Sequence, residues 1–292
     1  CIWLRRAGIP GPVFVVISLF AGNLTAQVLD EPQEGPRDSF YEKISFNNRK
    51  PFVFPYVRQA DVVWEWRVWR VIDFREKLNQ VFYYPVQPEQ GRVNLFYALE
   101  QAINEGKIKV YRDDEFKEEI NWAEVKLNLG TKRTTEVDSI DIDGTEMRVE
   151  KEVFIPLNSE DIKTLRIKEN WFIDKQRSVQ DVRIAGFAPI YYQVKEEGAA
   201  PITIPLFWVR YDDPEVRELL ANTEVYNPRN DAQRRSYDDI FLKRLFSSYI
   251  MRESSRYGDR TISQYTTGEE SLAESDLIRD KIYDMEEDMW EY

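Results

Sequence analysis

Histidine is absent from the sequence, and Cys1 is the only cysteine among its 292 residues. Without an imidazole, a serine or cysteine nucleophile has no histidine base, and zinc sites that use histidine are excluded. A single cysteine forms neither an internal disulfide nor a cysteine metal cage. We therefore expect no metal or other cofactor, and a fold that is stabilised by packing.

Enzyme motifs are missing as well, since the sequence has no glycine-rich phosphate loop and no G-x-S-x-G nucleophile elbow. Two carboxylates can hydrolyse a glycoside without histidine, but spacing in the sequence does not show two of them facing across a cleft. We interpret the chain as a non-enzyme without catalytic, cofactor-binding or metal-binding residues. The alternative is an exported carbohydrate-binding or carboxylate-dependent glycoside-acting protein.

The composition indicates a globular protein, because hydrophobic residues make up 42% of the chain and aromatic residues 14%. Acidic residues number 52 and basic residues 40, so the formal net charge is −12. Such a chain repels nucleic acid and bare anionic membranes. We expect protein partners and no nucleic acid.

The amino end has the pattern of a secretory signal peptide. Arg5 and Arg6 precede an apolar run over residues 13–21, and the small residue Ala26 lies at the expected cleavage position. We predict a signal peptide over 1–26, which would export the protein. Its apolar run is too short to span a bilayer as a helix.

We expect no direct membrane insertion of the exported product. Cys1 precedes the apolar run, whereas a lipoprotein cysteine follows it. No later stretch is long and apolar enough for a membrane helix. The expected location is therefore the periplasm, with any attachment to the outer membrane made through a partner.

The pattern of the remaining chain predicts an α+β fold of mixed helices and antiparallel hairpins with a helical carboxyl-terminal region. Residues 27–59 contain several prolines and no sustained period, which indicates an extended arm. This arm is either a loose linker or a strap laid over a neighbouring subunit. We predict an α+β core over 60–212 and a helical region with an acidic tail over 213–292.

The tryptophan-rich stretch over 60–80 is predicted to be a helix with apolar side chains around most of its circumference. Trp64, Trp66 and Trp69 lie in it, and tryptophan is enriched at interface hot spots. In a helix, Trp64 and Trp66 would point about 160° apart, so at least one would face a partner or another layer. We therefore name these three residues as candidate interface residues, with burial in the core as the alternative.

Residues 139–150 resemble a calcium-binding loop in part, but Ser139 occupies the first ligand position and the flanking residues alternate as strands. We predict a hairpin with a two-residue turn at Asp143-Gly144, which places Asp138 opposite Val149. A second hairpin is expected from the β-like runs over 179–194 and 202–211. Gly186 in its first strand indicates a bulge or an edge position.

Three helices have recognisable ends or faces. Asn94 is a predicted N-cap of a helix that stops at Gly106, and Ser236 with Asp239 resembles a capping box. The helix after Ser236 is predicted to continue through Ile250. The last helix carries an apolar stripe that consists of Leu272, Ile278, Ile282, Met285 and Met289.

Charge is unevenly distributed at the carboxyl end. Residues 264–292 have a net charge of −8, and residues 228–260 have a net charge of +3. The acidic tail is either a solvated helix face or a surface that meets the basic segment of a neighbouring copy. We name Met285 and Met289 as candidate interface residues on its apolar stripe, and we expect removal of the tail to leave a folded core.

Three blocks of sequence resemble the gliding motility protein family GldN, called PorN in non-gliding relatives. They are residues 68–77 (VWRVIDFREK), 167–178 (IKENWFIDKQRS) and 237–250 (YDDIFLKRLFSSYI), the last followed by Glu253-Ser254. The blocks occur in family order between about residue 60 and the carboxyl end.

The resemblance implies a structural component of the type IX secretion and gliding machinery. Members of this family associate with an outer-membrane lipoprotein, GldK or PorK, in a large periplasmic ring near the GldL and GldM motor. It therefore implies copies of the same chain and this lipoprotein as partners, and it supplies no catalytic positions.

Overall fold

The structure is a computed structural model that describes residues 49–89, 91–121, 123–125, 131–140, 146–155, 158–193, 202–227, 230 and 232–288. Only the backbone is described for 131–140 and 146–155. The predicted signal peptide over 1–26 and the candidate Met289 lie outside these residues. The predicted arm is described from residue 49 onward.

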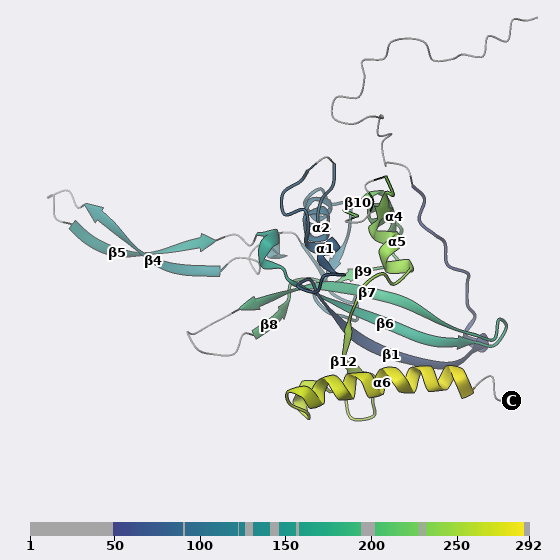
Figure 1. Ribbon diagram of the computed structural model, residues 1–292. Coiled ribbons are helices and arrows are strands. Elements are labelled where there is room, and N and C mark those ends of the chain that lie inside the picture. The colour runs from purple at the N-terminus through teal and green to yellow at the C-terminus, as the bar shows by residue number, and fades with distance from the viewer. Residues whose placement is uncertain are drawn as a thin grey trace, which may run out of the picture. The chain divides into compact units, whose positions relative to one another are not determined.

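A six-stranded antiparallel sheet forms the centre of the fold (Figure 1). Its strand order is β12-β1-β6-β7-β8, and β9 pairs with β7 beside this path. The strands are β1 (Val62–Asp73), β6 (Thr164–Asp174), β7 (Val179–Gln193), β8 (Ile202–Pro205), β9 (Val209–Arg210) and β12 (Tyr249–Glu253). Segments far apart in the sequence therefore meet in one sheet, with the last strand beside the first.

The prediction of a helix over 60–80 is wrong, because Val62–Asp73 forms strand β1. Valine, isoleucine and tryptophan favour strands, since their side chains pack well on a pleated surface. Strand β1 pairs with β6 along almost its whole length and with β12 near its carboxyl end. Apolar residues on both faces of a central strand, rather than around a helix, explain the broad distribution of hydrophobic side chains.

Strands β6 and β7 form a long hairpin. The bulge predicted from Gly186 is present in β7, next to this glycine. Lys168 pairs with Gly186 and Glu169 with Ile184, so Ala185 is the extra residue in β7. A Cβ atom at Gly186 would lie 2.5 Å from both a Phe116 ring carbon and the Val209 carbonyl oxygen. Glycine therefore allows β9 and the Phe116 ring to approach β7 closely.

The hairpin predicted near residues 139–150 is present as β4 (Thr131–Ile140) and β5 (Glu146–Ile155), but its predicted register is wrong. Asp138 pairs with Arg148, not with Val149. The pairing is shifted by one residue from the predicted one, which exchanges the faces of one strand. The predicted turn at Asp143-Gly144 lies outside the described residues.

Two shorter hairpins accompany the sheet, formed by β2 (Val110–Tyr111) with β3 (Glu119–Ile120) and by β10 (Glu224–Val225) with β11 (Arg235–Ser236). Single 3₁₀ turns occur at η1 (Gln59–Asp61), η2 (Ser159–Asp161) and η3 (Ile262–Gln264). These short elements connect the main strands and helices.

The helices are α1 (Gln80–Tyr83), α2 (Leu95–Asn104), α4 (Pro214–Asn222), α5 (Tyr237–Leu242) and α6 (Glu269–Asp288). The cap predictions are confirmed, because Asn94 accepts a hydrogen bond from the Tyr97 amide and Ser236 forms a capping box with Asp239. The predicted extent of α5 is wrong. It ends at Leu242, and Tyr249 and Ile250 belong to strand β12.

The largest buried cluster joins the sheet to four helices. Ile72, Leu165, Ile167 and Phe187 from the strands pack with buried side chains of α1, α2, α4 and α5. Helix α6 lies apart from these helices, beside β12 (Figure 1). The predicted α+β fold with a carboxyl-terminal helix is therefore confirmed.

Candidate functional site

The candidate residues Trp64 and Trp66 lie on the same face of strand β1, since side chains two residues apart point the same way in a strand. Their rings make an edge contact with centroids 5.7 Å apart. Both are partly buried against a cluster that includes Ile278 and Ile282 of α6. The structure thus places these two tryptophans at the junction between the sheet and the last helix.

The candidate Trp69 lies on the opposite face of β1 and is buried. It packs with Tyr111, Ala188 and Trp208. The structure therefore does not bring Trp69 together with Trp64 and Trp66. The partly buried candidate Met285 lies near the end of α6.

Helix α6 is fastened to the sheet through one face. Ile278 and Ile282 are buried, and the Ile250 amide of β12 donates a hydrogen bond of 2.8 Å to the Ser275 hydroxyl. Leu272 and Leu277 are exposed on its outer side. The apolar stripe is therefore narrower than predicted, because Leu272 does not belong to its buried part.

A buried ion cluster on one face of the sheet surrounds Glu169. The guanidinium of Arg244 contacts both carboxylate oxygens of Glu169, at 2.8 and 3.2 Å, and the Trp171 indole donates to the same carboxylate at 3.2 Å. Glu169 has no solvent exposure, so this fork supplies the counter-charge that a buried carboxylate requires. Arg244 adopts a φ of 50°, in the left-handed region that non-glycine residues rarely occupy.

Arg70 lies near the same cluster and is nearly buried. Its Nε donates a hydrogen bond of 2.9 Å to the Ser248 hydroxyl. Burial lowers the pKa of Arg70, and the nearby Glu169 carboxylate opposes this shift. The cluster thus connects β1, β6 and the segment between α5 and β12.

A second ion cluster lies on the other face, around Asp114 and Trp69. Asp114 accepts hydrogen bonds from the Trp69 indole at 2.9 Å and from the Arg252 guanidinium at 2.7 Å. The Arg252 guanidinium carbon lies 3.6 Å from the centroid of the Trp69 ring, a close cation–π contact. Lys168 donates to the Asp114 carbonyl, and burial lowers the pKa of this lysine.

The two clusters lie back to back, because Lys168 and Glu169 are consecutive residues of β6 and point to opposite faces. The carboxylates of Glu169 and Asp114 are each paired with a guanidinium, from Arg244 and Arg252. Such an arrangement holds strands and loops together, and it leaves both carboxylates engaged within the protein.

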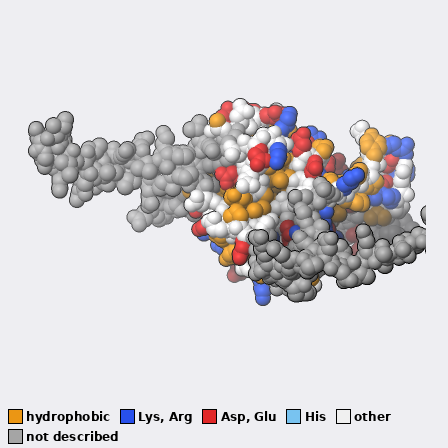
Figure 2. All heavy atoms as spheres, turned by 90° about the horizontal axis from the view of Figure 1, so that it is seen from above, with side chains coloured by type: hydrophobic (Ala, Val, Ile, Leu, Met, Phe, Trp, Pro, Cys, Tyr) orange, Lys and Arg blue, Asp and Glu red, His pale blue; other side chains and the backbone are white. Residues whose placement is uncertain are grey.

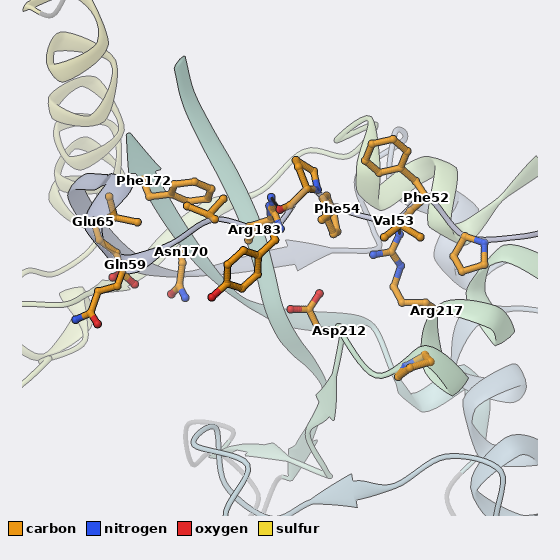
Figure 3. A pocket seen from close by; sticks show the side chains of 16 residues that line it. Phe52, Val53, Phe54, Gln59, Glu65, Asn170, Phe172, Arg183, Asp212 and Arg217 are labelled. Carbon is orange, nitrogen blue, oxygen red and sulfur yellow. Dashed lines mark hydrogen bonds between the residues drawn. The ribbon is translucent and has the colours of Figure 1, made fainter. Parts of the chain in front are cut away.

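Residues 49–58, named here the strap, cross the protein next to β7 and α4 (Figure 3). Arg217 donates a hydrogen bond of 2.9 Å to the Phe52 carbonyl, and Arg183 donates one of 3.1 Å to the Pro55 carbonyl. The Phe54 ring lies between the two guanidiniums, 4.2 Å from that of Arg183 and 4.9 Å from that of Arg217. The strap lines a groove with a volume of about 1070 Å³.

The strap presents apolar side chains to solvent. Val53 is 84% exposed and Tyr56 is 89% exposed, although Phe54 beside them is inserted between two arginines. Hydrophobic side chains also gather in places on the face shown in Figure 2, among acidic and basic side chains. Surfaces of this mixed kind are suited to contacts with other proteins.

In the part of the chain that the structure describes, no group of three or more acidic or cysteine side chains is placed to hold a metal ion. Among the same residues, no helix is both long enough and apolar enough to cross a bilayer.

A family model described as "Gliding motility associated protein GldN" matches residues 57–291. The chain belongs to the GldN family. A search of curated proteins gives no match. GldN proteins are components of the gliding motility and type IX secretion machinery, and GldN is not a known enzyme family.

The GldN blocks predicted from the sequence converge on the two clusters. The first supplies Trp69 and Arg70, the second Lys168 and Glu169, and the third Arg244. Their charge pattern in the sequence carries no sign of this pairing, since Glu169 and Arg244 are 75 residues apart. The resemblance alone marked these segments, and Asp114 lies outside all three blocks.

Proposed function

We propose that this GldN-family protein is a non-enzymatic structural subunit of the periplasmic ring of the type IX secretion and gliding machinery. It assembles with copies of itself and with an outer-membrane lipoprotein of the GldK or PorK type. The lipoprotein holds it at the outer membrane, close to motor components of the GldL and GldM type. Family membership over residues 57–291 supports this assignment.

The observation that carries the proposal is the position of the family's signature residues. Glu169, Arg244, Trp69 and Lys168 form closed ion clusters inside the sheet, where they stabilise the arrangement of strands. In an enzyme, signature residues would be expected to meet in an open cleft with unpaired reactive groups. A scaffold that presents surfaces to partners accounts better for buried and paired residues.

Two exposed surfaces are available for the proposed assembly. One is the strap, with its exposed apolar side chains, and the other is the outer face of α6 with Leu272, Leu277 and Tyr283. The outer face of α6 also carries most of the acidic residues of the tail. Apolar contacts provide affinity and charge selects the partner.

Co-expression with the lipoprotein tests the proposal. We expect the two proteins to elute together from gel filtration as a large assembly. Val53→Asp should reduce the fraction in that assembly by at least tenfold without changing the melting temperature, because Val53 makes no buried contact in the isolated chain. Val179→Asp, at another exposed valine at the start of β7, is the matched control and should assemble normally. A monodisperse monomer that ignores the lipoprotein would contradict the proposal.

A further inference from the structure

A cavity with a volume of about 310 Å³ lies on one face of the central sheet, away from the strap and its groove. Five strands contribute to its lining, through Val71, Arg166, Tyr192, Thr203 and Tyr249. These residues lie opposite one another in the sheet register: Val71 faces Arg166 and Tyr249, and Tyr192 faces Thr203. We call this cavity the arginine pocket.

Arg166 has no counter-charge in the pocket. Its Nε is buried and has no hydrogen-bond partner among the described residues. No aspartate or glutamate lines the cavity, in a chain with 52 acidic residues. A partly buried guanidinium with a buried, unpartnered Nε is costly, so a ligand that brings a negative charge would relieve this cost.

The surroundings of Arg166 disfavour its positive charge, which an anionic ligand would compensate. Burial lowers the pKa of Arg166, and the nearby Arg252 lowers it further, whereas Asp114 opposes these effects. Asp114, however, is already bonded to Trp69 and Arg252. The carboxylate that raises the pKa of Arg166 is therefore already engaged with other donors.

Hydroxyl groups provide further donors. The Tyr192 hydroxyl accepts a hydrogen bond of 3.0 Å from Thr164, which leaves its own proton for a ligand. Burial raises the pKa of Tyr249, so this hydroxyl remains protonated at neutral pH and can donate as well. Ser263 adds a hydroxyl at the exposed rim.

The remaining lining is largely apolar. Val71 and Ile190 are buried at the floor, and the exposed Leu272 of α6 lies at the rim. One guanidinium neutralises one negative charge, and its planar fork matches a carboxylate. The lining thus favours a singly charged acid with an apolar body over a doubly charged phosphate.

We propose that the arginine pocket binds the carboxylate of an apolar acid, with Arg166 as its counter-ion and the hydroxyls of Tyr192 and Tyr249 as donors. Two sources carry this chemistry: a free small acid and the carboxyl-terminal residue of a polypeptide. This proposal is independent of ring assembly, because it concerns a cavity within a single chain.

Binding of N-acetyl-L-leucine to the full chain, measured by titration calorimetry, tests the proposal. The neutral N-acetyl-L-leucinamide, in which a carboxamide replaces the carboxylate, should bind at least tenfold more weakly. Arg166→Gln should also weaken binding of the acid at least tenfold, and Tyr249→Phe should weaken it severalfold. Arg67→Gln, which removes a guanidinium outside the pocket, should leave binding unchanged.

A five-residue peptide that ends in leucine distinguishes the two sources. Tighter binding than N-acetyl-L-leucine by tenfold or more identifies a polypeptide end as the ligand, and equal or weaker binding identifies a small acid. Failure of both the acid and the peptide to bind overturns the proposal. Equal binding of the acid and its amide, or unchanged binding by Arg166→Gln, overturns it too.

Stability provides a readout that does not depend on the choice of probe. Because Arg166 has no anionic partner among the described residues, Arg166→Met should melt at or above the wild-type temperature when no acid is present. The acid should then raise the melting temperature of the wild type only. A large loss of stability in Arg166→Met would instead show that the arginine is structural, and would contradict the proposal.

Discussion

Arg244 shows how one residue connects distant parts of the chain. It leaves helix α5 with a left-handed backbone conformation and reaches Glu169 in the middle of the sheet. Its guanidinium also lies 5.3 Å from the centroids of both the Trp171 and Phe246 rings. A buried ion pair and aromatic contacts hold this unusual backbone conformation. The conformation follows the end of α5, which the sequence predicts to continue.

Arg244→Leu should lower the free energy of unfolding by about 3 to 5 kcal/mol, because it leaves Glu169 as an uncompensated buried charge. Urea denaturation measures this change. Arg279→Leu, in the exposed ion pairs of α6, is the control and should cost about 1 kcal/mol or less. A loss below about 1 kcal/mol for Arg244→Leu would mean that the Glu169 cluster contributes little.

Asp73 and Asp213 should respond to pH in opposite directions. Hydrogen bonds from Arg75 lower the pKa of Asp73 below its ordinary value of 3.8, whereas burial raises the pKa of Asp213. The stabilisation from Asp73 is therefore present above about pH 4 and is lost as the pH falls through its folded pKa. The contribution of Asp213 instead declines as the pH rises from about 4 through its folded pKa.

Asp73→Asn should destabilise the protein at pH 7 by about 1 kcal/mol or less, since Arg75 is mostly exposed, and this difference should shrink towards pH 3. Asp213→Asn should be neutral or stabilising at pH 7, because burial disfavours the charged carboxylate and the Asp213 side chain makes no capping hydrogen bond. Urea midpoints between pH 3 and 7 measure both variants. The same pH dependence in both would contradict these assignments.

At the scale of elements, the sequence predicts the amino-terminal caps of helices better than the identity of β1. The capping side chains at Asn94 and Ser236 are local signals, and both are confirmed. The nature of β1 depends on β6 and β12, which pair with it from positions about 100 and 180 residues away. Local periodicity does not contain these partners.

Sequence-based prediction misses the β4–β5 register and the partners within the ion clusters for similar reasons. Alternating strands of this kind can pair in registers that differ by one residue, and the sequence pattern does not select between them. The partners in the clusters, such as Asp114 and Arg252, come from separate elements that only the folded sheet brings together.

The packing of α6 changes the expectation that the acidic tail can be removed without loss of the core. Ile278 is fully buried against the cluster that contains Val68 and Ile250, while its neighbour Leu277 is 55% exposed. Removal of the tail would expose this cluster to water. We now expect truncation to lower the stability of the isolated chain, in addition to any effect on assembly.

Ile278→Ala should cost about 2 to 5 kcal/mol of unfolding free energy, as is usual for a buried isoleucine. Leu277→Ala, one residue along and on the outer face, should change stability by about 0.5 kcal/mol or less. Thermal or urea unfolding of the two variants measures the difference. Equal effects would show that α6 is not docked through the face that carries Ile278.

At the scale of the whole molecule, part of the charge asymmetry is accommodated within one chain. Helix α6 of the acidic tail packs beside β12, which belongs to the basic segment. The two segments therefore already meet without a neighbouring copy. Surfaces that remain free for partners are the outer side of α6 and the strap, where apolar side chains are exposed.

The central claim is that this GldN-family protein is a structural subunit attached to the outer membrane through a lipoprotein partner. Fractionation of cells with and without that lipoprotein tests it most directly. With the lipoprotein present, the protein should sediment with outer membranes. Without it, the protein should move to the soluble periplasmic fraction or be degraded. Unchanged association with outer membranes in the absence of the lipoprotein would contradict the account.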